Sequence, residues 1–229
     1  TSLREIKIDL QMKKNPKIKI ASNLVLRTNS LFKNFKKNID IKNVFYIEAD
    51  YIWGRKHKLF GWRSKIKDYS LILGAAIHMI DLVLWITNLK PISVYTVGSD
   101  KITKKTIFKK KSLILMLFEF SNGLIVKITA NAVAAYDHFH ELKIFSKNRT
   151  LINSKLGAVE YKKNKFQKIN SKYPDKKNRK KLIQNFLDTI INQKSKPMIS
   201  LKEQMDTMLV CFAAEKSLKL KRKVRIKYL

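Results

Sequence analysis

The stretch that decides the fold lies in the middle of the chain and consists of two apolar runs on either side of a short turn. Residues 113–131 read LILMLFEF, then SNG, then LIVKITAN. Apolar runs of this length, bounded by turn residues, are typical of strands. Ser121-Asn122-Gly123 favours a tight turn, because asparagine and glycine tolerate the positive φ angles that hairpin turns require. The stretch therefore predicts an antiparallel β-hairpin.

Similar patterns extend outward from this hairpin. Further strands are predicted at residues 43–53, 92–97, 141–145, 150–153, 159–161, 166–169 and 224–226, and helices at 31–39, 70–87, 181–192 and 200–218. Ser200 and Glu203 have the spacing of a capping box at the start of the last helix. Successive hairpins with interspersed helices predict an α/β protein. Its large open sheet, mostly antiparallel or mixed, is expected to carry helices on one face.

The first residues of the chain have a different organisation. Residues 3–14 predict an amphipathic helix that Asn15-Pro16 ends, and residues 18–26 predict a short buried strand. A helix, a turn and a strand in this order are typical of the last step of a parallel α/β sheet. We therefore predict that residues 1–28 are the remnant of a nucleotide-binding domain and that residues 29–229 form the second domain. Arg27 ends the predicted strand, where ligands gather in such sheets, so it is a candidate cofactor contact.

The composition predicts a packed protein in a reducing compartment. The 229 residues are 45% hydrophobic and include only 6 glycines and 4 prolines, which argues against disorder. The one cysteine, Cys211, excludes an internal disulfide framework and favours the cytoplasm. The longest apolar stretch, residues 71–87, contains Gly74, His78 and Asp81 and is short for a membrane span. We interpret it as a buried helix and expect no membrane association.

The formal net charge of +32 has two interpretations. Such a charge can mark a nucleic-acid-binding surface. Here, however, the lysines are scattered through every segment, and the aromatic residues lie mostly inside apolar runs rather than among the lysines. One cysteine cannot build a zinc finger, and no other metal site is predicted. We therefore favour a lysine-rich surface and keep nucleic-acid binding as a less favoured alternative.

The candidate for chemistry lies on the helix predicted at residues 70–87. Gly74 precedes His78 by about one turn, and Asp81 follows it by three residues. Gly74 would allow a ligand or another backbone to approach the helix closely. An imidazole titrates near neutral pH, so His78 could accept the proton of an alcohol during its oxidation. The alternative from the spacing alone is a core histidine that hydrogen bonds to Asp81 or to a carbonyl.

This helix resembles the active-site helix of the Gfo/Idh/MocA family of oxidoreductases. The resemblance rests on the run Leu73–Trp85, in which His, two residues, Asp and an apolar run ending in Trp follow one another. Other segments that resemble the family, in the same order, are Ser22–Arg27, Glu48–Tyr51, Phe118–Thr129, Lys143–Ile152 and Leu182–Asp188. The resemblance covers most of the chain, loosely outside the His78 segment.

The resemblance implies a Rossmann domain followed by an α/β domain whose open sheet forms the oligomer interface and one wall of the substrate pocket. It implies hydride transfer between NAD or NADP and a hydroxyl carbon of a sugar, cyclitol or similar polyol. His78 matches the family's catalytic histidine, and Asp81 would support its helix. We expect a homo-oligomer whose subunits contact one another through the sheet.

The chain also departs from the family's pattern. It contains no Gly-rich phosphate loop and no Glu-Lys-Pro segment, both of which would lie upstream of Thr1. Many members carry an aspartate one turn before the histidine, where this chain has Gly74. A second hypothesis is therefore a non-catalytic binding or scaffold relative without cofactor binding.

The basic segment before the helix contributes candidate substrate contacts. Arg63 could donate hydrogen bonds to a hydroxyl-rich or anionic substrate, and Trp62 and Lys65 flank it. For Trp62 a packing role, and for Lys65 a solvated position, are the alternatives. His138 and His140 alternate along one face of an extended segment. This spacing is a weak cue for a metal site or a substrate pocket, and we favour the interpretation that both are ordinary surface histidines.

Overall fold

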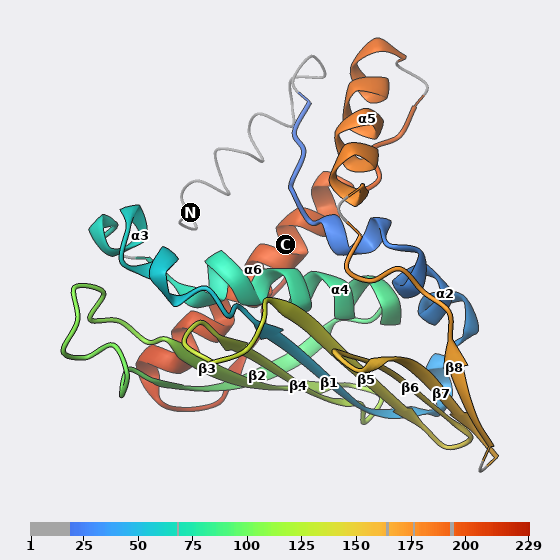
Figure 1. The fold of residues 1–229 in the computed structure, drawn as a ribbon, viewed down its shortest axis with the longest axis horizontal. Helices are drawn as coiled ribbons and strands as arrows, with labels where there is room; N and C mark the ends of the chain where they lie inside the picture. The colour runs from blue at the N-terminus through green and yellow to red at the C-terminus, as the bar shows by residue number, and fades with distance from the viewer. Residues whose placement is uncertain (1–18, 68, 164, 176, 193–194) are drawn as a thin grey trace.

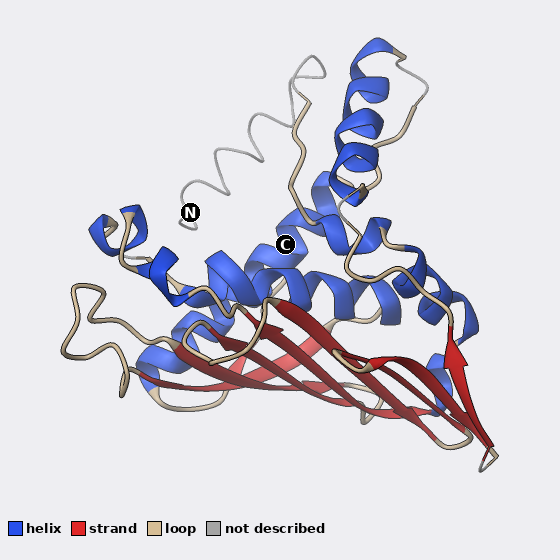
Figure 2. Ribbon diagram, in the orientation of Figure 1, coloured by secondary structure: helices blue, strands red, loops and turns tan. Residues whose placement is uncertain are grey.

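The computed structural model describes residues 19–67, 69–163, 165–175, 177–192 and 195–229. Within these residues, nine strands form a single sheet in the order β8-β7-β6-β5-β1-β4-β3-β2-β9. The strands are β1 Val44–Ile52, β2 Pro91–Ser99, β3 Leu113–Phe120, β4 Ile125–Asn131, β5 Phe139–Ser146, β6 Arg149–Ser154, β7 Gly157–Lys162, β8 Lys165–Ile169 and β9 Val224–Arg225. The helices are α2 Ser30–Asn38, α3 Trp62–Lys65, α4 Ile77–Thr87, α5 Asn178–Ile191 and α6 Leu201–Leu220. They lie on one side of the sheet (Figures 1 and 2), as the sequence predicted.

The sheet is mixed because β1 enters its centre. β1 runs parallel to β4, with Ala49 opposite Ile128, and antiparallel to β5, with Ala49 opposite Leu142. The other neighbouring strands are antiparallel. The hairpin predicted at residues 113–131 is present as β3 and β4, and Gly123 in its turn has a φ of +84°. A positive φ at this position is the reason that a glycine suits the turn.

The core forms where α4 and α6 pack on the inner face of the sheet. Met116 and Phe118 of β3 and Ile128 of β4 are buried on that face, and Met79 and Leu82 of α4 are buried above them. Strand side chains alternate between the two faces, so the opposite residues of the same strands point outward. One sequence pattern therefore builds both the core and a second, outer face.

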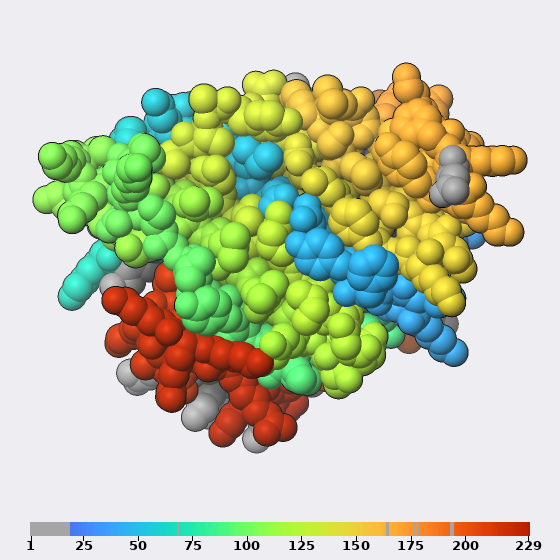
Figure 3. Space-filling view, turned by 90° about the horizontal axis from the view of Figure 1, so that it is seen from below, coloured from blue at the N-terminus to red at the C-terminus, as the bar shows by residue number. Residues whose placement is uncertain are grey.

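The outer face of the sheet combines an apolar area with a group of ion pairs. Figure 3 views the molecule from that side, where the strands are not covered by α4 or by most of α6. The side chains of β2 and β3 that remain exposed there are Tyr95, Val97, Leu113, Leu115 and Leu117. Toward the centre, Lys143 pairs with Glu48 at 3.0 Å and Lys127 with Asp50 at 3.5 Å.

The prediction of a strand at residues 18–26 is wrong for residues 19–26, which are the ones that the structure describes. Residues 19–24 pair with no described strand, and Val25–Thr28 form a 3-10 turn. Leu24 packs on Leu182 of α5 instead of entering the sheet. An apolar run becomes a strand only where a neighbouring strand satisfies its backbone groups, and none of the described strands lies beside it. The helix predicted at residues 3–14 lies outside the described residues.

Most other predicted elements are confirmed within two or three residues. The capping box is present: the Ser200 hydroxyl accepts from the Glu203 backbone N–H at 3.2 Å, and the Glu203 carboxylate accepts from the Ser200 N–H at 2.8 Å. The helix predicted at residues 70–87 differs in one respect, because its first part, Ile72–Ala76, is a π-helical turn. This turn lies directly before His78.

Candidate active site

His78 lies just after the junction between the π-helical turn and α4. The Ser70 hydroxyl caps the segment by accepting hydrogen bonds from the backbone N–H groups of Ile72 at 3.0 Å and Leu73 at 3.2 Å. The wider turn then runs from Ile72 to Ala76. π-turns inserted in helices occur frequently at functional sites, because they shift the side chains that follow from their regular helical positions.

Gly74 gives room to a neighbouring tyrosine. A Cβ atom at this position would lie 2.3 Å from the hydroxyl oxygen of Tyr69, so any larger residue would displace the Tyr69 ring. The sequence suggested that a ligand or a backbone would approach Gly74. The group that approaches it is the Tyr69 side chain.

The His78 ring is held by aromatic packing rather than by a carboxylate. It stacks on the Tyr51 ring at a centroid distance of 5.8 Å and an interplanar angle of 18°. Its Nδ1 is buried and, among the described residues, has no hydrogen-bond partner. Burial, together with His138 and Arg179, lowers the pKa of His78 to about 4. The imidazole is therefore neutral at pH 7 and can accept a proton.

Tyr51, at the end of β1, brings two more histidines to the same place. Its ring lies 5.3 Å from His138 and 4.7 Å from His140, and these two rings are 4.8 Å apart. Burial raises the pKa of Tyr51 to about 12, so its hydroxyl stays protonated. Burial also lowers the pKa values of His138 and His140. We name His78, His138, His140 and Tyr51 the histidine cluster.

A cavity of about 390 Å³ opens beside this cluster. Its wall includes His138, His140, Tyr173 and Arg179, together with Val25, Leu26, Pro174 and Asp175. The Tyr173 hydroxyl and Nδ1 of His140 are 2.5 Å apart. A cavity of this size, lined by a few polar side chains among apolar ones, is typical of small-ligand sites.

Arg63 lies on the other side of the histidine cluster, on the short helix α3. Its guanidinium carbon lies 4.9 Å from the Trp53 ring centroid and 4.2 Å from that of Trp62. Its Nε is buried without a hydrogen-bond partner among the described residues. The Trp62 ring contacts Tyr69 and remains 59% exposed, while Lys65 is exposed on the same helix. As substrate contacts, Arg63, Trp62 and Lys65 stay predictions.

Asp81 faces away from His78 and binds Arg27. The Arg27 guanidinium donates to both Asp81 oxygens, from Nε at 2.9 Å and 3.1 Å and from Nη2 at 2.6 Å, and it also bonds to Glu203. Burial raises the pKa of Asp81 to about 6, although Arg27 opposes the shift, so the carboxylate is ionised at neutral pH. The structure therefore does not support the alternative in which His78 is satisfied by Asp81. Asp81 instead fixes α4 to the chain around Arg27.

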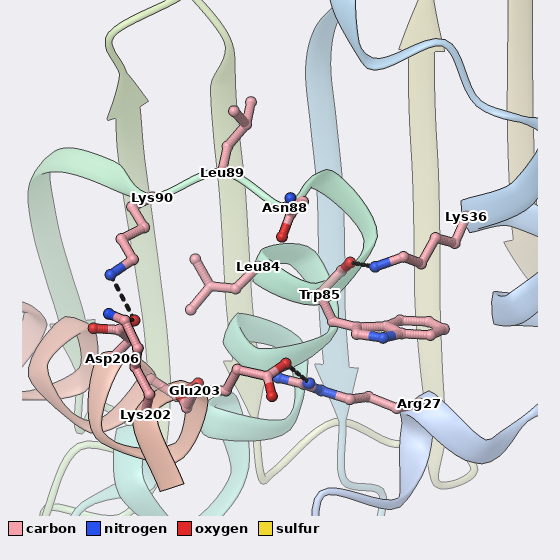
Figure 4. Close-up of a pocket in the computed structure, with 11 residues that line it drawn as sticks. Arg27, Lys36, Leu84, Trp85, Asn88, Leu89, Lys90, Lys202, Glu203 and Asp206 are labelled. Carbon is pink, nitrogen blue, oxygen red and sulfur yellow. Dashed lines mark hydrogen bonds and ion pairs between the residues drawn. The ribbon is translucent and has the colours of Figure 1, made fainter. Parts of the chain in front are cut away.

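Arg27 belongs to a second cavity, of about 240 Å³, at the other end of α4 (Figure 4). Lys36 and Trp85, which are linked by a hydrogen bond from the lysine to the backbone carbonyl, also line this cavity, as does Glu203. Because its guanidinium is already bonded to two carboxylates, the contacts of Arg27 favour a structural role. Its role in cofactor binding stays a prediction.

The described residues do not form a site for a dinucleotide. Such a site needs a Gly-rich turn between a strand and a helix, where backbone N–H groups meet the phosphates. No described strand–turn–helix has that composition, and Arg27 is engaged by Asp81 and Glu203. Within the same ranges, no group of three or more His, Cys, Asp or Glu side chains is arranged to hold a metal ion. No described helix is long and apolar enough to span a membrane.

The sequence found one part of this arrangement and missed another. It singled out His78, but it favoured ordinary surface positions for His138 and His140, whereas both contact Tyr51 and line the cavity. It did not predict Tyr51 or Tyr173 as site residues. The available signal was the alternate spacing of His138 and His140, which places both on one face of an extended segment. Tyr51 follows Asp50 on another predicted strand. Only the pairing of β1 with β5 brings them together.

Comparison with solved structures identifies relatives of this fold. A myo-inositol 2-dehydrogenase from Lactobacillus plantarum superposes with a TM-score of 0.81 at 16% identity, over 99% of this chain and 70% of that one. A scyllo-inositol dehydrogenase from Lactobacillus casei, solved with NAD(H) and scyllo-inositol, gives 0.75 at 14% identity, over 98% and 70%. A UDP-N-acetylglucosamine 3-dehydrogenase from Acidithiobacillus ferrooxidans gives 0.76 at 17% identity, over 96% and 67%.

The family assignment rests on a match of the sequence to a family profile. No curated protein matches the chain. Residues 38–152, just over half of the chain, match the profile of the GFO/IDH/MocA C-terminal domain. This region spans β1, the π-helical turn, α4 and the strands from β2 to most of β6, and so includes the whole histidine cluster. The chain therefore belongs to the Gfo/Idh/MocA family of oxidoreductases.

Proposed function

We propose that this protein takes part in NAD- or NADP-dependent oxidation and reduction of a sugar, cyclitol or similar polyol. In this proposal the described residues bind the polyol, and a segment outside them supplies the nicotinamide cofactor, which exchanges hydride with the hydroxyl carbon. We further propose that residues 1–28 belong to the cofactor domain and residues 29–229 to the substrate domain. The inositol dehydrogenases that share the fold make a polyol a reasonable substrate.

One observation carries the proposal: a neutral histidine whose neighbours in the histidine cluster, His138 and His140, line a cavity of suitable size. The His78 imidazole stacks on Tyr51, has an unpartnered Nδ1, and has a pKa of about 4. A histidine in this state can accept the hydroxyl proton of an alcohol. The cavity wall adds His138, Tyr173 and Arg179, whose polar groups can hydrogen bond to further hydroxyls.

The test is a pair of histidine variants in the full-length protein, assayed with hexoses, pentoses and cyclitols in the presence of NAD⁺ or NADP⁺. Replacing the proton acceptor (His78→Ala) should lower turnover by roughly two to four orders of magnitude. His57, which is exposed in the loop after β1, provides the matched control, and His57→Ala should retain turnover. Near-normal turnover in the His78 variant would remove His78 from the mechanism.

A second candidate is a binding or scaffold subunit without catalytic activity. It is favoured by Gly74, which leaves the Tyr69 hydroxyl rather than a carboxylate about one turn before His78. The two candidates differ in one result of the same assay. If the folded full-length protein binds polyols by calorimetry but reduces neither NAD⁺ nor NADP⁺ with any of them, the scaffold function is the better assignment.

We also propose that the protein is a cytoplasmic homo-oligomer that associates through the outer face of the sheet. The exposed apolar residues of β2 and β3, among them Tyr95, Val97 and Leu115, support this interface. Contiguous exposed apolar surface of this kind often marks contacts between proteins. The single cysteine, Cys211, is buried and reduced, which suits a reducing compartment.

A further inference from the structure

The cavity beside the histidine cluster has buried ring nitrogens that no described residue satisfies. Nδ1 of His78 and Nδ1 of His138 are both buried without a hydrogen-bond partner among the described residues. Nδ1 of His140, by contrast, is paired with the Tyr173 hydroxyl. A buried polar atom without a partner is costly, and such atoms are rare in folded proteins. His138 lines the cavity, so a ligand hydroxyl bound there could satisfy its Nδ1.

The charged side chains that shift the pKa values of the histidine cluster are, among the described residues, positively charged. Arg179, which lines the cavity, depresses the pKa of His78, and Arg55 does the same to His138 and His140. Arg55 and Arg63 also lower the pKa of Tyr51, against the larger effect of burial. Among the described residues, no carboxylate forms an ion pair with any of these three arginines.

One carboxylate, that of Asp175, also lies in the cavity wall. Asp175 accepts a hydrogen bond from the backbone N–H of Lys177 at 2.9 Å, an arrangement that fixes the turn before α5. Arg179 follows two residues later on α5 and lines the same cavity. The cavity thus combines an arginine that has no described carboxylate partner, neutral histidines, a tyrosine and, at the turn before α5, the Asp175 carboxylate.

We propose that the polyol bound beside His78 carries an anionic group, either a carboxylate or a phosphate, that Arg179 binds while His138 faces the hydroxyl groups. This inference rests on the proposed function and narrows its substrate class. Arginine presents a planar fork of donors that matches carboxylates and phosphates. The net charge of +32 adds a long-range attraction for any anion that approaches the protein.

Three ligands with the same ring test the charge preference directly. Glucose, glucuronate and glucose 6-phosphate differ only at the sixth carbon. This carbon belongs to a hydroxymethyl group in glucose, to a carboxylate in glucuronate and to a phosphorylated hydroxymethyl group in glucose 6-phosphate. By calorimetric titration into the full-length protein at low salt, at least one anion should bind about tenfold more tightly than glucose, because charge-assisted hydrogen bonds are the stronger kind. The better anion distinguishes a carboxylate site from a phosphate site, and added salt should reduce its advantage.

Two neighbouring variants on α5 locate the anion. Arg179→Gln should bring the affinity for the preferred anion to within about threefold of that for glucose, because the cationic partner is gone. Lys180→Gln removes the same charge from an adjacent exposed residue that does not line the cavity, so it should keep the full preference. Equal losses in both variants would indicate a general charge effect and would overturn the role of Arg179.

The outcome of this experiment does not depend on turnover. Glucose binding as tightly as both anions, or no binding by either anion, would overturn the proposal even if the protein oxidises neutral polyols. Conversely, a preference for an anion that Arg179→Gln abolishes would support it even if no cofactor is reduced. The second result would leave the anion site in place while rejecting the dehydrogenase function.

Discussion

His78 illustrates how one buried side chain sets a dependence of stability on pH. The histidine is neutral in the folded protein because its pKa is about 4, whereas in the unfolded chain its pKa is about 6.5. Below pH 6.5 the unfolded state therefore binds more protons, and folding stability decreases as the pH falls. His78 alone should lower the free energy of unfolding by about 2 kcal/mol between about pH 7.5 and about pH 5.

Urea denaturation at these two pH values, on the wild type and on two variants, measures this contribution. His78→Gln should reduce the pH dependence by that amount, because the group that titrates has been removed. His57→Gln should leave it unchanged, since His57 is exposed. If His78→Gln and the wild type lose the same stability between the two pH values, the buried neutral state of His78 is wrong.

At the scale of elements, Arg27 and Asp81 join three parts of the fold. The 3-10 turn Val25–Thr28, α4 and α6 meet at their hydrogen bonds, and both side chains of the pair are almost fully buried. Arg27→Met should reduce the free energy of unfolding by about 3–5 kcal/mol, because the buried Asp81 carboxyl would lose its partner and would have to take up a proton to remain in the interior. Replacing both partners, Arg27→Met with Asp81→Leu, should recover most of this loss.

The matched control for this pair is an ion pair between two strands. Arg149 and Glu160 join β6 to β7 at 2.8 Å and are partly exposed, so Arg149→Met should cost less than about 1 kcal/mol. Chemical denaturation of the four proteins gives the comparison. A loss of similar size for Arg27→Met and Arg149→Met would contradict the idea that burial makes the first pair important.

At the scale of the whole molecule, the outer face of the sheet should determine the oligomeric state. Leu115 lies near the middle of the exposed apolar residues on β2 and β3, and Leu115→Lys would place a charge in the proposed interface. Light scattering coupled to gel filtration should show a smaller particle than the wild type. Leu156, which is fully exposed in the turn between β6 and β7, is the control, and Leu156→Lys should keep the wild-type mass.

Two results would contradict this interface. If the wild type is already monomeric across the measurable concentration range, no association takes place through the sheet. If Leu115→Lys keeps the wild-type mass while its circular dichroism remains native, association uses another surface. Either result would leave the proposal for the His78 site untouched, because the histidine cluster lies on the opposite, inner side of the sheet, where the helices pack.

Local sequence patterns determined most of the secondary structure of this protein. The hairpin of β3 and β4, the turn at Gly123 and the capping box at Ser200 are properties of short segments, and each is present as predicted. The position of His78 on a helix followed from the same kind of pattern. These features depend on contacts between residues close in the chain, so a short window of sequence contains the necessary information.

The tertiary structure alone decided what surrounds His78 and what residues 19–28 become. His138 and His140 reach Tyr51 because β1 lies between β4 and β5, an order of strands that no short window encodes. The apolar run near Leu24 had the composition of a strand, but it packs on α5 and not beside any described strand. Apolar periodicity specifies which side of a segment is buried, whereas the segment's partner depends on the whole chain.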